Sequence, residues 1–333
     1  MQEKKVLILG GAGFIGSHLV ELLLGKRNIG KVNSRPEYVR DVTVLDSFEY
    51  CYFDNLDSVK DRIKVVTADA NNVGVWLKRE AECGVIYDEI YHLAAIADTL
   101  DFTAQPIESF KVSVMPMLDI LEYKMDINKD CKLLFTSSSE IYGEAEVMPT
   151  PESYNGNLSC DGVRSGYDEG KRAGETIIAG YYREYGISCT RVRIFNTYGE
   201  RQRASGNLVG RMVHDALKYG EIMVDMPGNQ VRTLLHVSDC VEMLVNVMEK
   251  QLNNPVNVGG VDIISVEEFA GLVSFLVKKQ LKKKVRITKD NERYGDIKRR
   301  IPDISIASDM YGFCPRVSLE EGVTRVIEYW RNR

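Results

Sequence analysis

The sequence lacks the features that build metal centres, disulfide frameworks and membrane spans. Its four histidines show no ligand spacing, and its seven cysteines are odd in number and contain no Cys-x-x-Cys pair, so neither a zinc site nor a set of disulfides is expected. No apolar stretch approaches the roughly 18 residues that a membrane-spanning helix requires. The opening "MQEKKVLILGG" runs directly into a strand-like segment. We therefore expect reduced thiols, no metal, no membrane partner and a cytoplasmic location.

An excess of positive charge is also missing. The formal net charge is −5, whereas a general nucleic-acid-binding protein carries a basic surface; a small anion is still compatible as a partner. The basic run at residues 278–289 is interpreted as a solvated helix end and loop. With 333 residues, of which 44% are hydrophobic, the chain is long enough for one substantial core and a smaller lobe.

What the sequence does contain, in its first two thirds, is an alternation of strand-like and helical segments. Apolar residues spaced three to four apart predict helices at 17–26, 108–124 and around 167–185. Short β-branched or leucine-rich runs lie at 5–10, 41–46, 63–69, 89–95, 132–138 and 188–196. Strands that alternate with helices indicate βαβ units, so we predict an α/β fold built on a Rossmann-like, doubly wound parallel sheet.

Beyond about residue 200 the pattern is less regular. Helices are predicted at 207–219, 238–251 and 265–280, short strands at 221–225, 255–258 and 285–288, and an amphipathic helix at 319–333. We expect residues 1–200 to form a dinucleotide-binding domain. Residues 201–333 would form a smaller α/β substrate-binding lobe over the carboxyl edge of the sheet, with some crossing of the chain between the two.

A glycine-rich turn, "GGAGFIG" at 10–16, follows the first strand and opens the first helix. Gly10 allows a tight turn, Gly13 lets the backbone approach a diphosphate, and Gly16 lets the helix pack closely on the strand. Asp46 ends the second strand, where it would bind ribose hydroxyls and repel a 2′-phosphate. The pattern therefore favours NAD over NADP. Asp69, at the next strand end, is a candidate acceptor for the adenine amino group.

Tyr167 and Lys171 lie four residues apart in a predicted helix, and hence on one face of it. A tyrosine near its usual pKa of about 10 is a poor base, but an adjacent ammonium stabilises the phenolate and lowers the pKa. Such a pair could remove the proton of an alcohol while NAD takes the hydride. The strand that precedes this helix ends in serine hydroxyls that could bind the same alcohol.

The motifs "GGAGFIGSHL", "YHLAA", "TSSSEIYG", "YDEGKR", "RIFNTYG" and "RTLLHVSD" together resemble the extended short-chain dehydrogenase/reductase superfamily, the NAD-dependent epimerases and dehydratases of nucleotide sugars. The resemblance covers essentially the whole chain. It implies oxidation of the sugar 4-hydroxyl by NAD, with Ser138, Tyr167 and Lys171 as the catalytic group. From this resemblance and from the glycine turn, we expect cofactor contacts at the following residues: Gly10, Gly13, Phe14, Ile15, Gly16, Asp46, Asp69, Ala70, Leu93, Ala94, Ala95, Tyr167 and Lys171. We expect substrate contacts at Ser139, Asn196, Arg201, Arg232 and Arg300.

Glu140, directly after the serines, distinguishes between members of the superfamily. A 4-epimerase needs no acid there, and similar epimerases carry a small residue. Chemistry at carbon 5 does need one, because a 4-keto uronate is a β-keto acid that loses carbon dioxide through an enolate, which must then be protonated. The Ser139-Glu140 pair resembles that of UDP-glucuronate decarboxylases and of GDP-mannose 4,6-dehydratases, and differs from the Asp-Glu pair of dTDP-glucose dehydratases.

Two further segments resemble the decarboxylases. "YDEGKR" matches their Tyr-Lys helix, and "RRIPDIS" at 299–305 matches their C-terminal signature, in which the arginine before proline, here Arg300, helps catalysis. A guanidinium opposite a sugar carboxylate is physically reasonable. Several substrate-contacting segments depart from the decarboxylase pattern: Thr99, Phe102 in place of a tyrosine, Ser113, "SCDG" at 159–162 and "SGNLVGRM" at 205–212.

The leading hypothesis is therefore an NAD-dependent enzyme that decarboxylates a UDP-hexuronate, with catalytic residues Ser138, Glu140, Tyr167, Lys171 and Arg300. A 4,6-dehydratase of the GDP-mannose type, a 4-epimerase and a simple 4-dehydrogenase remain alternatives, and a non-catalytic NAD-binding scaffold is a more remote one. The aromatic run "YYREY" at 181–185 is interpreted as helix packing within a homodimer face of the kind this superfamily builds from two helices per subunit.

Overall fold

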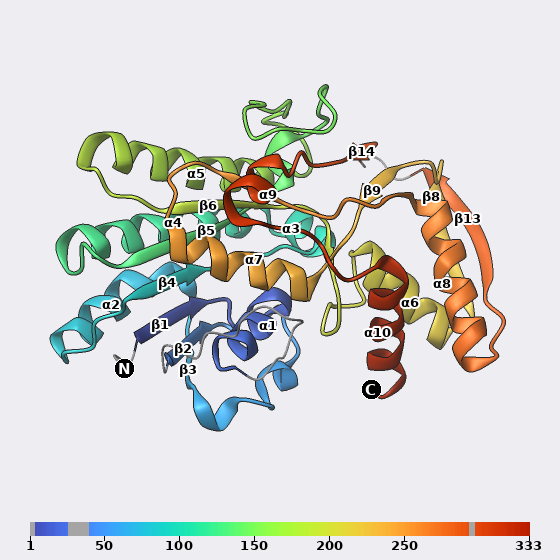
Figure 1. Cartoon of the computed structure of the whole chain (residues 1–333), viewed down its shortest axis with the longest axis horizontal. Coiled ribbons are helices and arrows are strands. Elements are labelled where there is room, and N and C mark those ends of the chain that lie inside the picture. Colours follow the sequence, from blue (N-terminus) through green and yellow to red (C-terminus); the bar gives the residue numbers. More distant parts are fainter. Residues whose placement is uncertain (1–3, 26–39, 293–296) are drawn as a thin grey trace.

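The computed structural model describes residues 4–25, 40–292 and 297–333, and its centre is a seven-stranded sheet in the order β11-β6-β5-β4-β1-β2-β3 (Figure 1). Every neighbouring pair in this sheet is parallel. The strands are β1 (Lys4–Leu9), β2 (Arg40–Asp46), β3 (Lys64–Thr67), β4 (Glu89–His92), β5 (Lys132–Ser138), β6 (Thr190–Ile194) and β11 (Val256–Val258). The predicted Rossmann-like α/β fold is confirmed.

Helices cover both faces of the sheet because its strands are apolar on both faces. In β1, Val6 and Ile8 pack with α1 and α7, whereas Leu7 and Leu9 pack on the other face with α2, α4 and α5. The helices of these two layers are α1 (Phe14–Leu23), α2 (Val73–Glu82), α4 (Pro106–Asp126), α5 (Ser165–Tyr185) and α7 (Val237–Lys250). Short helical turns connect them: η1 (Phe53–Leu56), η2 (Lys60–Arg62), η3 (Ala70–Asn72), α3 (Thr99–Ala104) and η4 (Ser139–Tyr142).

The smaller lobe has its own apolar core between three helices and a two-stranded parallel sheet. These elements are α6 (Leu208–Lys218), α8 (Val266–Leu281), α10 (Leu319–Arg331), β8 (Glu221–Met226) and β13 (Arg286–Glu292). A three-stranded sheet in the order β12-β9-β14 consists of β9 (Val231–Thr233), β12 (Ile263–Ser265) and β14 (Arg299–Arg300). In it Arg300 is paired with Arg232 across β9 and β14. The sequence pattern did not predict this small sheet.

The chain crosses between the two lobes more than once. β7 (Thr197–Tyr198) pairs with β10 (Leu235–His236) where the lobes meet. Beyond residue 200, α7 packs on the main sheet, β11 extends that sheet beside β6, and α9 (Ser305–Tyr311) packs with both. Residues 201–333 therefore supply part of the large domain as well as the small lobe (Figure 1).

The turn between β1 and α1 depends on glycine. Gly10 has a φ of +78°, in the left-handed region that favours glycine. A Cβ on Gly16 would lie 2.1 Å from the carbonyl oxygen of Gly10 and 2.7 Å from the Cα of Gly11. The first turn of α1 thus rests directly on the backbone of the loop, as sequence analysis predicted for Gly16.

Replacing Gly16 by alanine should lower the free energy of unfolding by about 1–3 kcal/mol, because the methyl group must displace backbone rather than a flexible side chain. Chemical denaturation measures this change. Gly271→Ala is the matched control: it also lies in a helix, but no heavy atom of the described residues lies within 4 Å of the place its methyl group would take, so it should stabilise the protein by about 0.5–1 kcal/mol. Equal stability of the Gly16 variant and wild type would contradict the close packing.

Candidate active site

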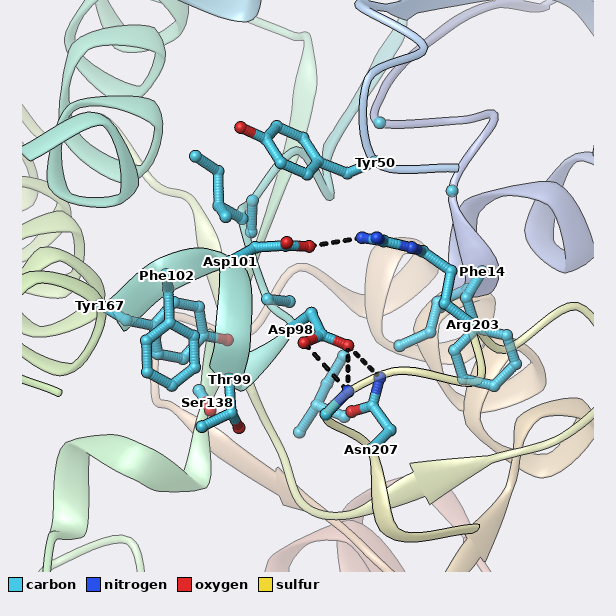
Figure 2. A pocket seen from close by; sticks show the side chains of 18 of the residues that line it. Phe14, Tyr50, Asp98, Thr99, Asp101, Phe102, Ser138, Tyr167, Arg203 and Asn207 are labelled. Carbon is cyan, nitrogen blue, oxygen red and sulfur yellow. Dashed lines mark hydrogen bonds and ion pairs between the residues drawn. The ribbon is translucent and has the colours of Figure 1, made fainter. Parts of the chain in front are cut away.

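A cavity of about 770 Å³ lies at the carboxyl edge of the main sheet, between the sheet and the small lobe. Open α/β sheets bind their ligands at this edge because the loops that follow the parallel strands meet there. All of the residues predicted to bind cofactor or substrate line this cavity. Figure 2 shows part of it, with Ser138 and Tyr167 beside the short helix α3 and the small-lobe residues Arg203 and Asn207 opposite.

One end of the cavity has the geometry of a dinucleotide cradle. The Asp46 carboxylate accepts hydrogen bonds from the backbone N–H groups of Ala12 and Phe48, both at 2.9 Å. Burial raises the pKa of Asp46, and these amide bonds oppose the rise. A Cβ on Gly13 would lie 3.2 Å from the Gly10 oxygen, so a side chain there would crowd the turn, and Gly10, Gly13 and Gly16 all line the cavity. The residues present therefore fit a dinucleotide.

Asp69 makes a more local contact than predicted. It is the N-cap of η3, and its Oδ1 accepts from the N–H of Asn71 at 2.9 Å. Ala70, Leu93, Ala94 and Ala95 line the same end of the cavity. A contact between Asp69 and adenine stays a prediction.

The predicted catalytic group is brought together by β5 and α5. Ser138 ends β5, and its hydroxyl is hydrogen-bonded to Tyr167. Lys171 is 1% exposed; its Nζ donates to the carbonyl oxygen of Thr136 at 2.9 Å and lies 5.8 Å from the centroid of the Tyr167 ring. The three side chains thus meet at one point of the cavity wall, although β5 and α5 are separated by a long loop.

Burial dominates the titration of this group. It raises the pKa of Tyr167 to about 12, which the hydrogen bond from Ser138 opposes and the charge of Glu140 reinforces. It lowers the pKa of Lys171 to about 7. The expectation of a lowered pKa for Tyr167 is therefore wrong for this structure: desolvation of the phenolate outweighs the effect of a neighbouring ammonium that is itself destabilised by burial.

Glu140 lies between two guanidiniums. Arg300 from β14 binds both carboxylate oxygens, with Nη1–Oε1 at 2.5 Å and Nη2–Oε2 at 2.6 Å. Arg164, the N-cap residue of α5, binds Oε2 at 2.7 Å. Burial alone would raise the pKa of Glu140, but the charges of Arg300 and Arg164 hold it below its usual value. Glu140 is therefore an ionised, fully paired carboxylate beside Ser138 and Tyr167.

Two residues that the sequence reasoning did not assign to the site, Arg164 and Asp168, complete this cluster. Asp168 is 4% exposed, and burial, reinforced by the charge of Glu140, raises its pKa to about 7. Arg164 lies between the two carboxylates, 4.0 Å from Asp168, and its Cζ is 5.0 Å from the ring of Phe102. In the sequence, the one sign that Arg164 belongs to the site is its position almost one helical turn before Tyr167. That position does not reveal Glu140 as its partner.

The residues predicted to contact the substrate differ in how they are held. Arg232 is 5% exposed and donates to the carbonyl oxygen of Val231 at 3.0 Å. The buried Oδ1 of Asn196 has no hydrogen-bond partner within the described part of the chain, so it is available to a ligand. Arg201 lines the cavity, and its guanidinium is 2.5 Å from the carboxylate of Glu21 on α1, which offsets its charge; its contact with the substrate stays a prediction.

The described residues offer no resident metal centre. Among residues 4–25, 40–292 and 297–333, no group of three or more His, Cys, Asp or Glu side chains is placed to hold a metal ion. Over the same ranges, no helix has both the length and the apolar character needed to cross a membrane.

Comparison with known proteins agrees with this geometry. Residues 7–326 match the family model described as GDP-mannose 4,6 dehydratase. The chain is 35% identical to UDP-glucuronic acid decarboxylase 6 of Arabidopsis thaliana, covering 99% of this chain and 89% of that protein. UDP-glucose 4-epimerase of Thermotoga maritima, solved with UDP-glucose, superposes with a TM-score of 0.84 at 27% identity, covering 98% and 99% of the two chains. UDP-glucose 4-epimerase of Thermus thermophilus, solved with NAD, gives 0.81 at 26% identity, covering 98% and 99%.

Removing the Ser138 hydroxyl should move the pH dependence of alcohol oxidation. Because its hydrogen bond lowers the pKa of Tyr167, Ser138→Ala raises that pKa, and the acid limb of kcat/KM moves to higher pH. The rate near neutrality should fall roughly 100-fold, as for loss of one donor to a developing oxyanion. Ser137→Ala is the control, since that hydroxyl donates to Glu175 at 2.5 Å and its loss should leave the pH profile in place. An unmoved acid limb in the Ser138 variant would contradict the assignment.

Proposed function

The chain belongs to the family described as GDP-mannose 4,6 dehydratase, and we propose that within it this protein is an NAD-dependent nucleotide-sugar enzyme that decarboxylates a UDP-hexuronate. UDP-glucuronate is the first candidate substrate, and UDP-xylose or its 4-keto form the product. Residues 1–200 would carry the cofactor and the catalytic group, and residues 201–333 most of the nucleotide-sugar site. The relatives named as UDP-glucuronic acid decarboxylases support this choice.

The first step is oxidation at carbon 4. NAD, when bound in the glycine cradle, accepts the hydride. Tyr167 takes the hydroxyl proton, Ser138 holds the oxygen from which it leaves, and Lys171 holds the nicotinamide ribose and stabilises the phenolate. The buried position of all three side chains excludes water from the transfer, and the high pKa of Tyr167 makes its phenolate a strong base once it forms.

The observation that carries the decarboxylase proposal is the pairing of Glu140 with both Arg300 and Arg164. Burial raises the pKa of Asp168 to about 7, so this second carboxylate is only partly ionised near neutrality and the guanidiniums of Arg300 and Arg164 are not fully offset by Glu140 and Asp168. The positive charge that remains beside Ser138 favours a sugar that bears a carboxylate. After oxidation the C5–C6 bond breaks, its electron pair forms the C4–C5 enolate, and carbon dioxide leaves. A guanidinium stabilises the carboxylate before this step and the enolate oxygen after it.

Glu140 has two roles in this proposal. It fixes the position of Arg300, since both of its oxygens are bound by guanidiniums. It also delivers the proton that carbon 5 of the enolate gains once carbon dioxide has left. Glu140 must first take up this proton from solvent, which requires that the substrate carboxylate draw the arginines away, because the two guanidiniums otherwise hold Glu140 ionised. Asn196 and Arg232 would hold the diphosphate and nucleotide end of the substrate.

The main alternative is a 4,6-dehydratase of the GDP-mannose type. The Ser139-Glu140 pair suits it equally, and the replacement of a hydrogen-bonding tyrosine by Phe102 removes a contact to glucuronate. The solved neighbours named as 4-epimerases support a 4-epimerase, and a 4-dehydrogenase would need only the oxidation step, but neither reaction uses the Glu140 cluster.

A panel of substrates separates these activities. Purified protein is incubated with UDP-glucuronate, UDP-galacturonate, GDP-mannose, dTDP-glucose and UDP-glucose, and the products are analysed by mass spectrometry. Loss of carbon dioxide from a uronate is the expected result. Loss of water would assign a dehydratase, an isomer of unchanged mass an epimerase, and free NADH with a keto sugar a dehydrogenase. If neither UDP-glucuronate nor UDP-galacturonate is turned over, the leading proposal is wrong.

Glu140→Gln should separate the two steps. Oxidation at carbon 4, seen as NADH formation, should persist, whereas release of decarboxylated sugar should fall by at least roughly 100-fold. The variant also leaves two buried guanidiniums under-compensated, at a cost of about 3–5 kcal/mol. Glu175→Gln is the matched control, because Glu175 forms a similarly buried pair with Arg193 at 2.8 Å outside the cavity; it should lose stability without uncoupling the steps. If Glu140→Gln releases decarboxylated sugar at the wild-type rate, the role of the Glu140 carboxylate is structural.

We further propose that the protein acts in the cytoplasm as a homodimer formed by α4 and α5. These helices pack side by side, and apolar side chains remain exposed on both: Met115 is 46% and Tyr182 47% exposed. Met115→Asp and Tyr182→Asp should therefore yield monomers in analytical ultracentrifugation. Phe275→Asp, at a 57% exposed apolar position on α8, should leave the mass unchanged. A monomeric wild type would contradict this assignment.

A further inference from the structure

The short helix α3 lies between the small lobe and the helix that carries Tyr167 (Figure 2). Its N-cap is Asp98, which accepts from the N–H of Leu100 at 3.0 Å. One turn of helix brings Asp101 and Phe102 into the same region of the cavity wall. Asp98 and Asp101 contact the small-lobe segment 203–207, whereas Phe102 contacts Tyr167.

Asp98 and Asp101 join α3 to the small lobe. Asp98 is 6% exposed and accepts hydrogen bonds from the hydroxyl of Ser205, from the N–H of Gly206 at 3.0 Å and from Nδ2 of Asn207 at 3.2 Å. Asp101 forms an ion pair with Arg203. A carboxylate that accepts several charge-assisted hydrogen bonds in a buried place fixes the backbone around it firmly.

The loop packs on α3 through its backbone. A Cβ on Gly206 would lie 2.6 Å from Oδ1 of Asp98 and 3.2 Å from the backbone nitrogens of Thr99 and Leu100. Only a residue without a side chain fits here. The segment 203–207 is therefore in direct contact with the start of α3, and movement of one requires movement of the other.

Phe102 joins the same helix to the catalytic side. It is 2% exposed, and its ring is stacked on the ring of Tyr167 with centroids 4.9 Å apart and an interplanar angle of 13° (Figure 2). Arg164, which binds Glu140, lies 5.0 Å from the Phe102 ring. The plane of the Tyr167 ring is thus set by a residue of α3.

We propose that α3 is a positioning element for Tyr167, in which docking of the small-lobe segment 203–207 onto Asp98 and Asp101 sets the ring of Phe102 and, through it, the ring of Tyr167. Asp98 and Phe102 are positioning residues: they act through Tyr167 rather than on the reacting atoms. This inference rests on the proposed role of Tyr167 as base. It ties the alignment of the phenol to the contact between segment 203–207 and α3.

The kinetic test uses variants from both ends of the contact. Asp98→Asn, Gly206→Ala and Phe102→Leu should each lower kcat by roughly 10- to 100-fold, the cost of displacing a catalytic group by up to about 1 Å, with the KM of the nucleotide sugar changed far less. Because all three act through α3, Asp98→Asn combined with Phe102→Leu should lower kcat no more than the worse single change. If the double variant instead lowers kcat by the product of the two single-variant factors, the coupling through α3 is wrong.

One control variant and one pH profile separate positioning from loss of stability. Asp239→Asn also removes a buried carboxylate charge that accepts from two backbone N–H groups, those of Arg316 and Val317, both at 3.0 Å, but outside the cavity; it should lower thermal stability without changing kcat. Phe102→Leu should also move the acid limb of the pH profile to lower pH, since burial is what raises the pKa of Tyr167. A kcat loss in Asp239→Asn equal to that in Asp98→Asn would count against positioning.

A spectroscopic test is independent of turnover. A fluorine label on the ring of Tyr167 reports the stacked Phe102 ring through its chemical shift. Phe102→Leu should move this resonance, and Asp98→Asn and Gly206→Ala should move it in the same direction; an unmoved signal in the last two overturns the coupling. If Tyr167→Phe still turns over substrate, the proposed base role fails, while the fluorine result still decides whether α3 connects the loop to this ring.

Discussion

The arrangement of the site depends on one buried ionic contact, between Glu140 at the end of β5 and Arg300 on β14. The two residues are 160 positions apart, and each side chain is about one-tenth exposed. Around this contact the chain is also joined by backbone: the N–H of Thr150 donates to the oxygen of Ile301 at 2.8 Å, and the N–H of Asp303 donates to the oxygen of Thr150 at 2.9 Å. A short strand of the small lobe is therefore held against Glu140, two residues after Ser138 at the end of the catalytic strand.

Tyr167 lies between this contact and a second one on the opposite side. Arg164 connects Glu140 to the face of Phe102, and Phe102 connects in turn to α3 and to the loop that binds Asp98. The catalytic ring is thus enclosed by two junctions between the lobes, one ionic and one built from hydrogen bonds. Since both involve charged groups that are largely removed from water, each is strong when complete and costly when one partner is missing.

Burial, more than any single neighbour, sets the chemistry of these groups. It pushes the pKa of Tyr167 up, that of Lys171 down and that of Asp168 up, while Glu140 stays ionised because two guanidiniums outweigh its desolvation. The resulting site has one unambiguous anion, two cations against it, and a set of groups whose charge state responds to what enters the cavity. Such a site suits a reaction that begins with proton removal and continues with loss of a carboxylate.

The sequence by itself determined the parallel sheet, the glycine turn with Asp46, and the placement of Tyr167 and Lys171 on one helical face. These features follow from local periodicity and from spacing within a single βα unit, which hydrophobic pattern and backbone sterics dictate. It also marked Glu140 as unusual. Only the tertiary structure decided what Glu140 touches, that Phe102 stacks on Tyr167, and that Arg201 faces α1. These contacts join elements that are far apart in the chain. The burial that inverts the expected pKa shift of Tyr167 likewise arises only when the two lobes are packed together.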